Sequence, residues 1–155
     1  MKTVIIILRI GLLIGVMDGL AASLNAYLSS GVMPDRVFRF IASGVFGVEA
    51  FKGSGAMIVW GVMFHLLIAL LWTAFYLFLN AKFDWIRQHH LVSGVLYGVF
   101  IWAVMAYVVL PLSNTPTLAK SLSGALIMIG IHIFVIGIPM SHMLGRYSSY
   151  NIAKR

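Results

Sequence analysis

The chain has 155 residues, of which 61% are hydrophobic and only 10% are charged, and its mean hydropathy is +1.00. A soluble domain carries about 25% charged residues, so this composition argues against a soluble enzyme, a disordered regulator and a nucleic-acid-binding module. The net charge of +7 comes from basic residues in the short gaps between apolar stretches, which is their distribution in membrane proteins. Because the chain has no cysteine, disulfides and cysteine-ligated metals are excluded.

Four apolar stretches are long enough to cross a bilayer, which takes about 20 helical residues. They are residues 4–28, 57–79, 91–110 and 122–144. None has the alternating pattern of a barrel strand, so helices are the spanning structure that remains. Short connections predict antiparallel neighbours, and therefore an all-α, four-transmembrane-helix up-down bundle in a single domain, residues 1–155. Arg9 interrupts the first apolar stretch, which favours a retained helix over a cleaved signal peptide.

Residues 34–51, between the first and second spans, have a different pattern. Pro34 suits a helix start, and Val37 and Ile41 share one helical face while Arg36 and Arg39 lie on another. The segment is too short to span, so it predicts an amphipathic helix lying in the membrane interface. On such a helix, Arg36 and Arg39 are candidates for binding lipid headgroups.

The distribution of lysine and arginine predicts the orientation in the membrane. Seven basic residues fall on the side of the two termini and four on the opposite side. The positive-inside rule therefore places both termini in the cytoplasm.

Small residues recur at spacings that allow helices to pack closely. Gly11, Gly15 and Gly19 are four residues apart in the first span, Gly61 lies in the second, and Gly94 and Gly98 lie in the third. These glycines are candidates for helix packing, within the chain or in a homo-oligomer, and a pore or ligand slot lined by them is the alternative.

Three ionisable residues lie deep inside the predicted spans, away from the helix ends, where burial of an unpaired charge costs about 2–3 kcal/mol or more. At about 1.5 Å per residue, Asp18, His65 and His132 all fall about 12–15 Å below the outer ends of their helices. Asn25 shares a helical face with Asp18, and Trp102 reaches a similar depth. The sequence therefore predicts one polar layer in the outer half of the bundle.

Three interpretations of this layer remain open. It is a structural network that holds the helices in register, a proton or small-solute pathway, or a ligand site. For the last, His65 and His132 are the metal-ligand candidates: they could bind haem axially, or bind a first-row metal together with Asp18. No catalytic constellation or nucleotide-binding motif accompanies them, which argues against an enzyme.

Three segments carry a resemblance to known proteins. They are the run from Arg39 to Gly47, the pair Gly61 and His65, and the run from Pro111 to Ser113. They resemble an uncharacterised family of small bacterial four-helix inner-membrane proteins and, more loosely, the YagU-like inner-membrane proteins. The resemblance implies a bacterial cytoplasmic membrane and brings no established activity. The leading hypothesis is a non-enzymatic, multi-pass protein that forms an oligomer or a subunit of a membrane assembly. The alternatives are a transport bundle and a haem or metal protein of membrane electron transfer.

Overall fold

The computed structural model describes residues 2–117 and 121–152, and this part of the chain is helical, with no strand. Lys120, Lys154 and Arg155, which contribute to the predicted orientation, lie outside the described residues. The elements in chain order are α1 (Lys2–Ser30), α2 (Pro34–Phe46), α3 (Glu49–Lys52), α4 (Ala56–Lys82), α5 (Asp84–Gln88), α6 (His90–Val104), η1 (Met105–Val109), α7 (Leu110–Leu112), α8 (Leu122–Ile131), η2 (His132–Gly137) and α9 (Ile138–Ile152).

Four helices are long and apolar enough to cross a membrane. They are Thr3–Ser30, Ala56–Lys82, His90–Leu112 and Leu122–Gly145, the last two being continuous helices made of several consecutive elements. Each contains one of the four predicted spans, so the all-helical class is confirmed, and the four helices are compatible with a multi-pass membrane protein. The helices extend beyond the apolar stretches from which they were predicted. The backbone hydrogen bonds of a helix can continue into polar sequence, so the end of an apolar stretch does not mark the end of its helix.

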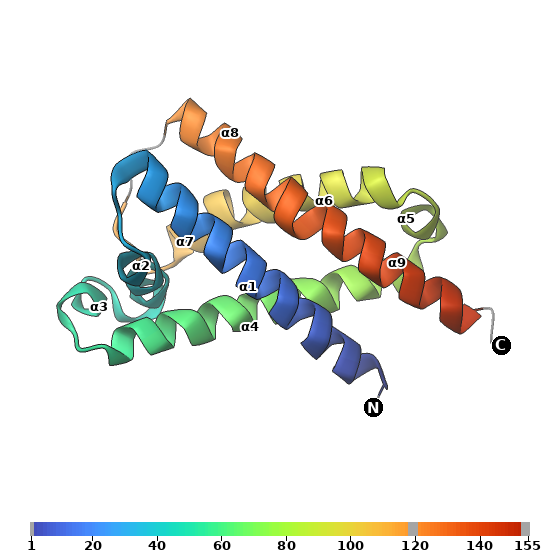
Figure 1. Cartoon of the computed structure of the whole chain (residues 1–155), viewed down its shortest axis with the longest axis horizontal. Helices are drawn as coiled ribbons and strands as arrows, with labels where there is room; N and C mark the ends of the chain where they lie inside the picture. Colours follow the sequence, from blue (N-terminus) through green and yellow to red (C-terminus); the bar gives the residue numbers. More distant parts are fainter. Residues whose placement is uncertain (1, 118–120, 153–155) are drawn as a thin grey trace.

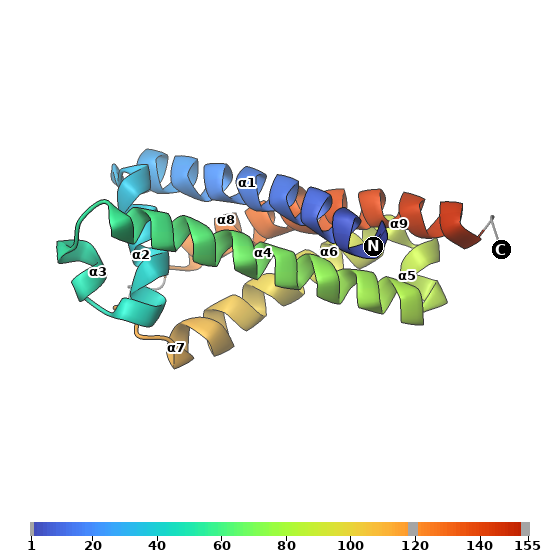
Figure 2. The same cartoon turned by 90° about the horizontal axis from the view of Figure 1, so that it is seen from below.

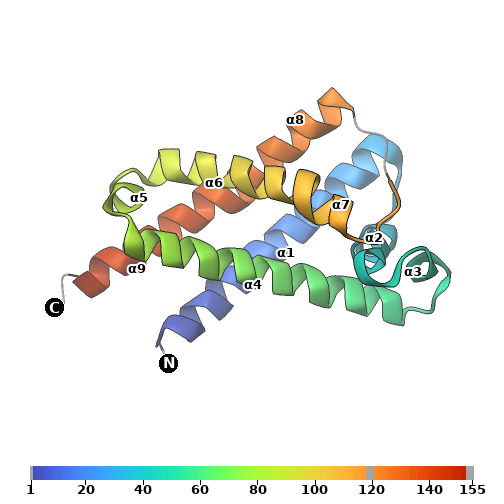
Figure 3. The same ribbon diagram turned by 180° about the vertical axis from the view of Figure 1, so that it is seen from behind.

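The two ends of the bundle differ in what they carry. Figure 1 shows both chain termini and α5 at one end, which we call the terminal end, and α2, α3, α7 and the start of α8 at the other, the α2 end. Helix α2 runs across the α2 end, transverse to α4 (Figure 2), and lies among the ends of α1, α4 and α7 (Figure 3).

Helix α2 is shorter than the amphipathic segment predicted for residues 34–51. It ends at Phe46 because Gly47 has φ = 60°, a backbone conformation that favours glycine, and the chain then forms the separate turn α3. Ala42 and Ser43 of α2 are buried, whereas Val45 and Val48, which continue the predicted apolar face of Val37 and Ile41, are exposed. Against α4, α2 places the rings of Phe38 and Phe46, which contact His65 and Trp60.

Two π-helical segments, η1 and η2, interrupt the long helices, and each ends two residues before a proline. Pro111 and Pro139 lack the N–H that an α-helix needs, and their rings crowd the carbonyl four residues earlier. The wider turn is visible in the hydrogen bonds from Leu110 N to the carbonyl of Met105 and from Ile138 N to the carbonyl of Ile133, each spanning five residues.

The predicted packing glycines lie at contacts between helices of this same chain. A Cβ on Gly11 would lie 2.7 Å from Leu70 Cδ2, and one on Gly15 would lie 2.9 Å from Ala69 Cβ, both on α4. A Cβ on Gly61 would overlap the carbonyl of Phe38 in α2. The glycine stripe of α1 is therefore used within the chain and gives no separate reason to expect a second copy.

The glycines of α6 face the fourth long helix. A Cβ on Gly98 would lie 2.7 Å from the carbonyl oxygen of His132, and one on Gly94 would lie 2.9 Å from that of Gly137. Gly137 was not among the predicted packing residues, although it lies directly against the backbone of Gly94. Close backbone approach at this pair replaces the interlocking of large side chains.

The interior and the surface differ in polarity in the manner of a protein surrounded by lipid. Large apolar side chains such as Leu20, Leu71 and Phe134 are exposed. The buried residues of α4 are instead small or polar: Gly61, Thr73, Tyr76 and Asn80. The inward face of α4 therefore carries polar groups into the interior.

Candidate functional site

Asp18 of α1, His65 of α4 and His132 at the start of η2 come together in the interior, and we call this group the Asp–His centre. His65 Nε2 lies 3.9 Å from Asp18 Oδ2, and the two side chains are 14% and 16% exposed. His132 is buried, and Asp18 lies within electrostatic range of both histidines. The arrangement agrees with the single polar layer predicted from helix depth.

Backbone carbonyls orient both imidazoles. His65 Nε2 donates to the carbonyl of Gly15 at 2.8 Å, and His132 Nδ1 donates to the carbonyl of Met128 at 2.8 Å. A carbonyl only accepts, so these nitrogens carry the hydrogens, and the other ring nitrogen of each neutral histidine has a free lone pair. Each histidine can therefore take up a proton without losing the bond that positions its ring.

Asp18 differs from the other carboxylates of the chain. The chain has four Asp and Glu residues, all within the described residues. The other three form ion pairs within their own helices, namely Asp35 with Arg39 at 3.9 Å, Glu49 with Lys52 at 3.0 Å, and Asp84 with Arg87. Asp18 has only histidine as an ionic neighbour, and its Oδ1 is buried without a hydrogen-bond partner.

Neighbouring small and aromatic residues shape the space around His65. Gly19 of α1 lies beside the imidazole, and the ring of Phe38 in α2 packs edge-on against it with centroids 6.2 Å apart. Residues from α1, α2, α4 and η2 thus enclose the centre, which restricts its access to bulk water.

Two further residues predicted for this layer have other contacts. Asn25 Nδ2 lies 3.8 Å from the sulfur of Met128, the residue whose carbonyl holds His132. The Trp102 ring packs edge-on against Tyr107 of η1, with centroids 5.7 Å apart. Asn25 is thus connected to the Asp–His centre through Met128, whereas Trp102 packs against a residue of its own long helix.

The two arginines predicted to bind lipid headgroups differ in their surroundings. Arg36 is exposed, as a headgroup ligand would be. The Arg39 guanidinium is largely buried and donates to the carbonyls of Ala50 at 2.9 Å and Gly53 at 2.8 Å. Arg39 therefore caps α3 with its charge.

The same geometry bears on the metal hypothesis. Within residues 2–117 and 121–152, no three His, Asp or Glu side chains are grouped so that they could hold a metal ion. The two histidines and Asp18 therefore do not form a ready two-histidine, one-carboxylate site.

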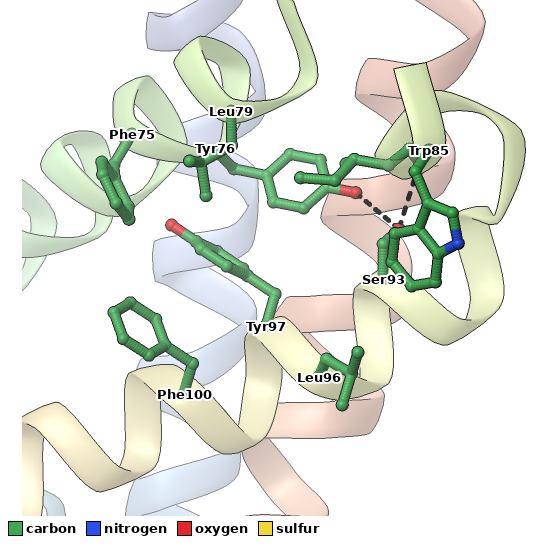
Figure 4. A pocket seen from close by; sticks show the side chains of 9 residues that line it. Phe75, Tyr76, Leu79, Trp85, Ser93, Leu96, Tyr97 and Phe100 are labelled. Atoms are coloured by element: carbon green, nitrogen blue, oxygen red, sulfur yellow. Dashed lines mark hydrogen bonds between the residues drawn. The ribbon is translucent and has the colours of Figure 1, made fainter. Parts of the chain in front are cut away.

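A second polar group lies toward the terminal end, and the sequence did not predict it. Tyr76 Oη lies 3.0 Å from Ser93 Oγ (Figure 4), and Ser141 donates to the carbonyl of His90 at 2.7 Å. Asn80, one turn from Tyr76 on α4, is fully buried. We call these five residues the Tyr–Asn centre.

The Tyr–Asn centre was missed because the apolar stretches ended too early. Asn80 and His90 fell in the connection predicted between the second and third spans, where polar residues need no explanation. The available signal was the spacing of Tyr76 and Asn80, four residues apart on the face that also carries Thr73.

No protein-family model, no curated protein and no solved structure matches the chain. The resemblance to small bacterial inner-membrane proteins therefore stays a prediction, and function has to be argued from the two centres themselves.

Proposed function

We propose that this protein is a proton-handling membrane protein in which Asp18, His65 and His132 bind and release protons inside the bilayer. The observation that carries the proposal is the pairing of Asp18. It is the one carboxylate of the four in the chain, all described, whose ionic neighbours are histidines rather than lysine or arginine. Histidine titrates near neutral pH, and an acid–histidine group within a membrane is a common element of proton relays.

Charge balance supports one exchangeable proton. In a low-dielectric interior, an uncompensated charge is strongly disfavoured. One proton distributed over a carboxylate and two imidazoles makes the centre neutral overall, either as a carboxylic acid or as an imidazolium–carboxylate pair. The proton then belongs to the group as a whole, as it does in other closely coupled titrating sites.

The proposal includes a placement in the bilayer. The four long helices cross the membrane in alternating directions, α2 lies in the interface, and the terminal end faces the cytoplasm of a bacterial cell. The short connections between the spans support the first statement, the transverse course of α2 (Figure 2) supports the second, and the excess of basic residues on the side of the termini supports the third.

Infrared difference spectroscopy tests proton binding directly. The protein would be reconstituted in lipid nanodiscs and taken from about pH 8 to about pH 5, the range in which histidine changes charge. We expect a carboxyl signal and imidazole signals that change together. Asp18→Asn should remove the carboxyl signal and alter the imidazole signals.

Asp35→Asn is the matched control, since Asp35 is half-exposed on α2 and lies near Arg39. This variant should keep the coupled change. A carboxyl signal unaffected by Asp18→Asn, or imidazole signals that do not respond to it, would refute the proposal.

A further inference from the structure

The interior holds two polar centres with an apolar layer between them. Along α4, His65 of the Asp–His centre and Asn80 of the Tyr–Asn centre are 15 residues apart, about 22 Å of helix. That distance is most of a hydrocarbon core about 30 Å thick. Both centres therefore lie within the spanning region, one toward each end of the bundle.

The apolar layer consists of Ile14, Ile101 and Ile136. Ile14 is one turn from Asp18, and Ile136 is one turn from His132, each toward the terminal end. The three side chains are 1%, 1% and 7% exposed and belong to one core cluster with Tyr76. On the α4 side, the helices approach so closely that a Cβ on Gly15 would lie 2.9 Å from Ala69 Cβ.

Buried polar atoms without a partner occur on both sides of this layer. In the described part of the chain they are Asp18 Oδ1, both amide atoms of Asn80 and His90 Nδ1, and all four belong to the two centres. An unsatisfied buried polar atom costs about 1–3 kcal/mol. Ordered water in polar internal sites commonly satisfies such atoms.

The Tyr–Asn centre also offers hydroxyl groups that can relay a proton. Tyr76 and Ser93 are within hydrogen-bond distance of each other, and either oxygen could be the donor. Figure 4 shows this pair beside Trp85, close to α5 at the terminal end. Protons could therefore pass between this centre and the terminal end by way of hydroxyls and water.

From this arrangement we infer that the two centres are the two halves of one proton path, and that Ile14, Ile101 and Ile136 form an apolar gate that closes it. Hydrophobic constrictions stop conduction in channels by excluding water. In the conformation described, the gate is shut, so protons reach each centre from its own side only. The inference rests on the proposed proton binding by the Asp–His centre and adds the path, its second centre and the gate.

Making the gate polar tests the inference through a gain of function. Purified protein would be reconstituted in liposomes that contain a pH-sensitive dye, and proton flux would be measured under an imposed potential. We expect low flux for the unmodified protein and a rise of about tenfold or more for Ile101→Asn, because a polar side chain admits water to the constriction. Ile14→Ser is a second, smaller change to the same layer and should act in the same direction.

The matched control is Leu71→Asn, which makes the same kind of change on the exposed surface of α4. It should leave the flux low. Circular dichroism and size-exclusion chromatography would show that each variant is folded before its flux is interpreted.

Double variants show whether the flux follows the proposed path. Adding Asp18→Asn or Asn80→Leu to Ile101→Asn should return the flux to the unmodified level, since each removes a polar centre on one side of the gate. The inference is overturned if folded Ile101→Asn and Ile14→Ser conduct no more than the unmodified protein, or if the double variants conduct as well as Ile101→Asn. Either result would leave the infrared test of the Asp–His centre standing, so the two proposals fail separately.

Discussion

The imidazole of His65 lies directly beside Gly19, where a Cβ would come within 3.1 Å of His65 Nε2. That nitrogen also donates to the Gly15 carbonyl and faces Asp18. The absence of a side chain at residue 19 thus determines how closely α1 and the histidine of α4 approach each other. Gly19 therefore belongs to the packing stripe of α1 and also contacts the Asp–His centre.

Gly19→Val should therefore disturb the Asp–His centre without changing any titratable group. The added side chain would displace the His65 ring from Gly15 and Asp18, and overpacking of this kind costs about 1–3 kcal/mol. Infrared difference spectra should show weaker coupling between the carboxyl and imidazole signals. Gly130→Val is the control, since a Cβ there meets no atom within 4 Å. Equal effects of the two substitutions would contradict the assigned role of Gly19.

Gly61→Ala should separate α2 from α4. The Cβ would overlap backbone atoms of Phe38, which cannot move aside as a flexible side chain can. We expect a loss of about 1–3 kcal/mol in the free energy of unfolding, measured by denaturant titration in mixed micelles. Gly55→Ala, at the start of the same helix, has open space around the new Cβ and should be close to neutral. A Gly61→Ala variant as stable as Gly55→Ala would mean that α2 does not pack as described.

Arg39→Ala should release α3 while leaving the long helices in place. It removes the hydrogen bonds to the carbonyls of Ala50 and Gly53, and bonds from a charged donor contribute about 1.5–3 kcal/mol each at most. Hydrogen exchange should become faster for the amides of residues 47–53. Arg36→Ala removes an exposed arginine from the same helix and should leave this exchange unchanged. Similar exchange in the two variants would show that Arg39 does not hold α3.

The orientation can be tested with single cysteines because the chain has none of its own. Ser54 and Gln88 are both exposed and lie at opposite ends of α4. We expect Ser54→Cys to react with a membrane-impermeant maleimide in intact cells, and Gln88→Cys to react only after the membrane is opened. The reverse pattern would invert the orientation, and labelling of both from one side would show that α4 does not span.

The fold class could be predicted because a helix is the one structure that satisfies the backbone of a long apolar stretch in lipid. The break at Gly47 could not, because its positive φ depends on how the chain turns back toward α4. The π-helical segments were also missed, although Pro111 and Pro139 carry the signal. Proline can end, bend or widen a helix, and tertiary packing determines which of these occurs.

The depth of the Asp–His centre could be predicted, whereas the direction of its side chains could not. Counting residues from the helix ends placed Asp18, His65 and His132 in one layer, because rise along a helix is regular. Which way each side chain points depends on rotation of the helices about their axes. For His132 this rotation also depends on η2, whose wider turn begins at that residue.

Helix α2 has a mechanical consequence for the Asp–His centre. Asn114, in the segment after α7, donates from its backbone N–H to the carbonyl of Gly44 at 3.1 Å and from Nδ2 to that of Val45 at 3.2 Å. At its other side, α2 presses Phe38 against His65. A single rigid segment thus joins the far end of the third long helix to the imidazole in the interior. A displacement of α2 relative to α4 will therefore act, through Phe38, on the position of the His65 ring beside Asp18.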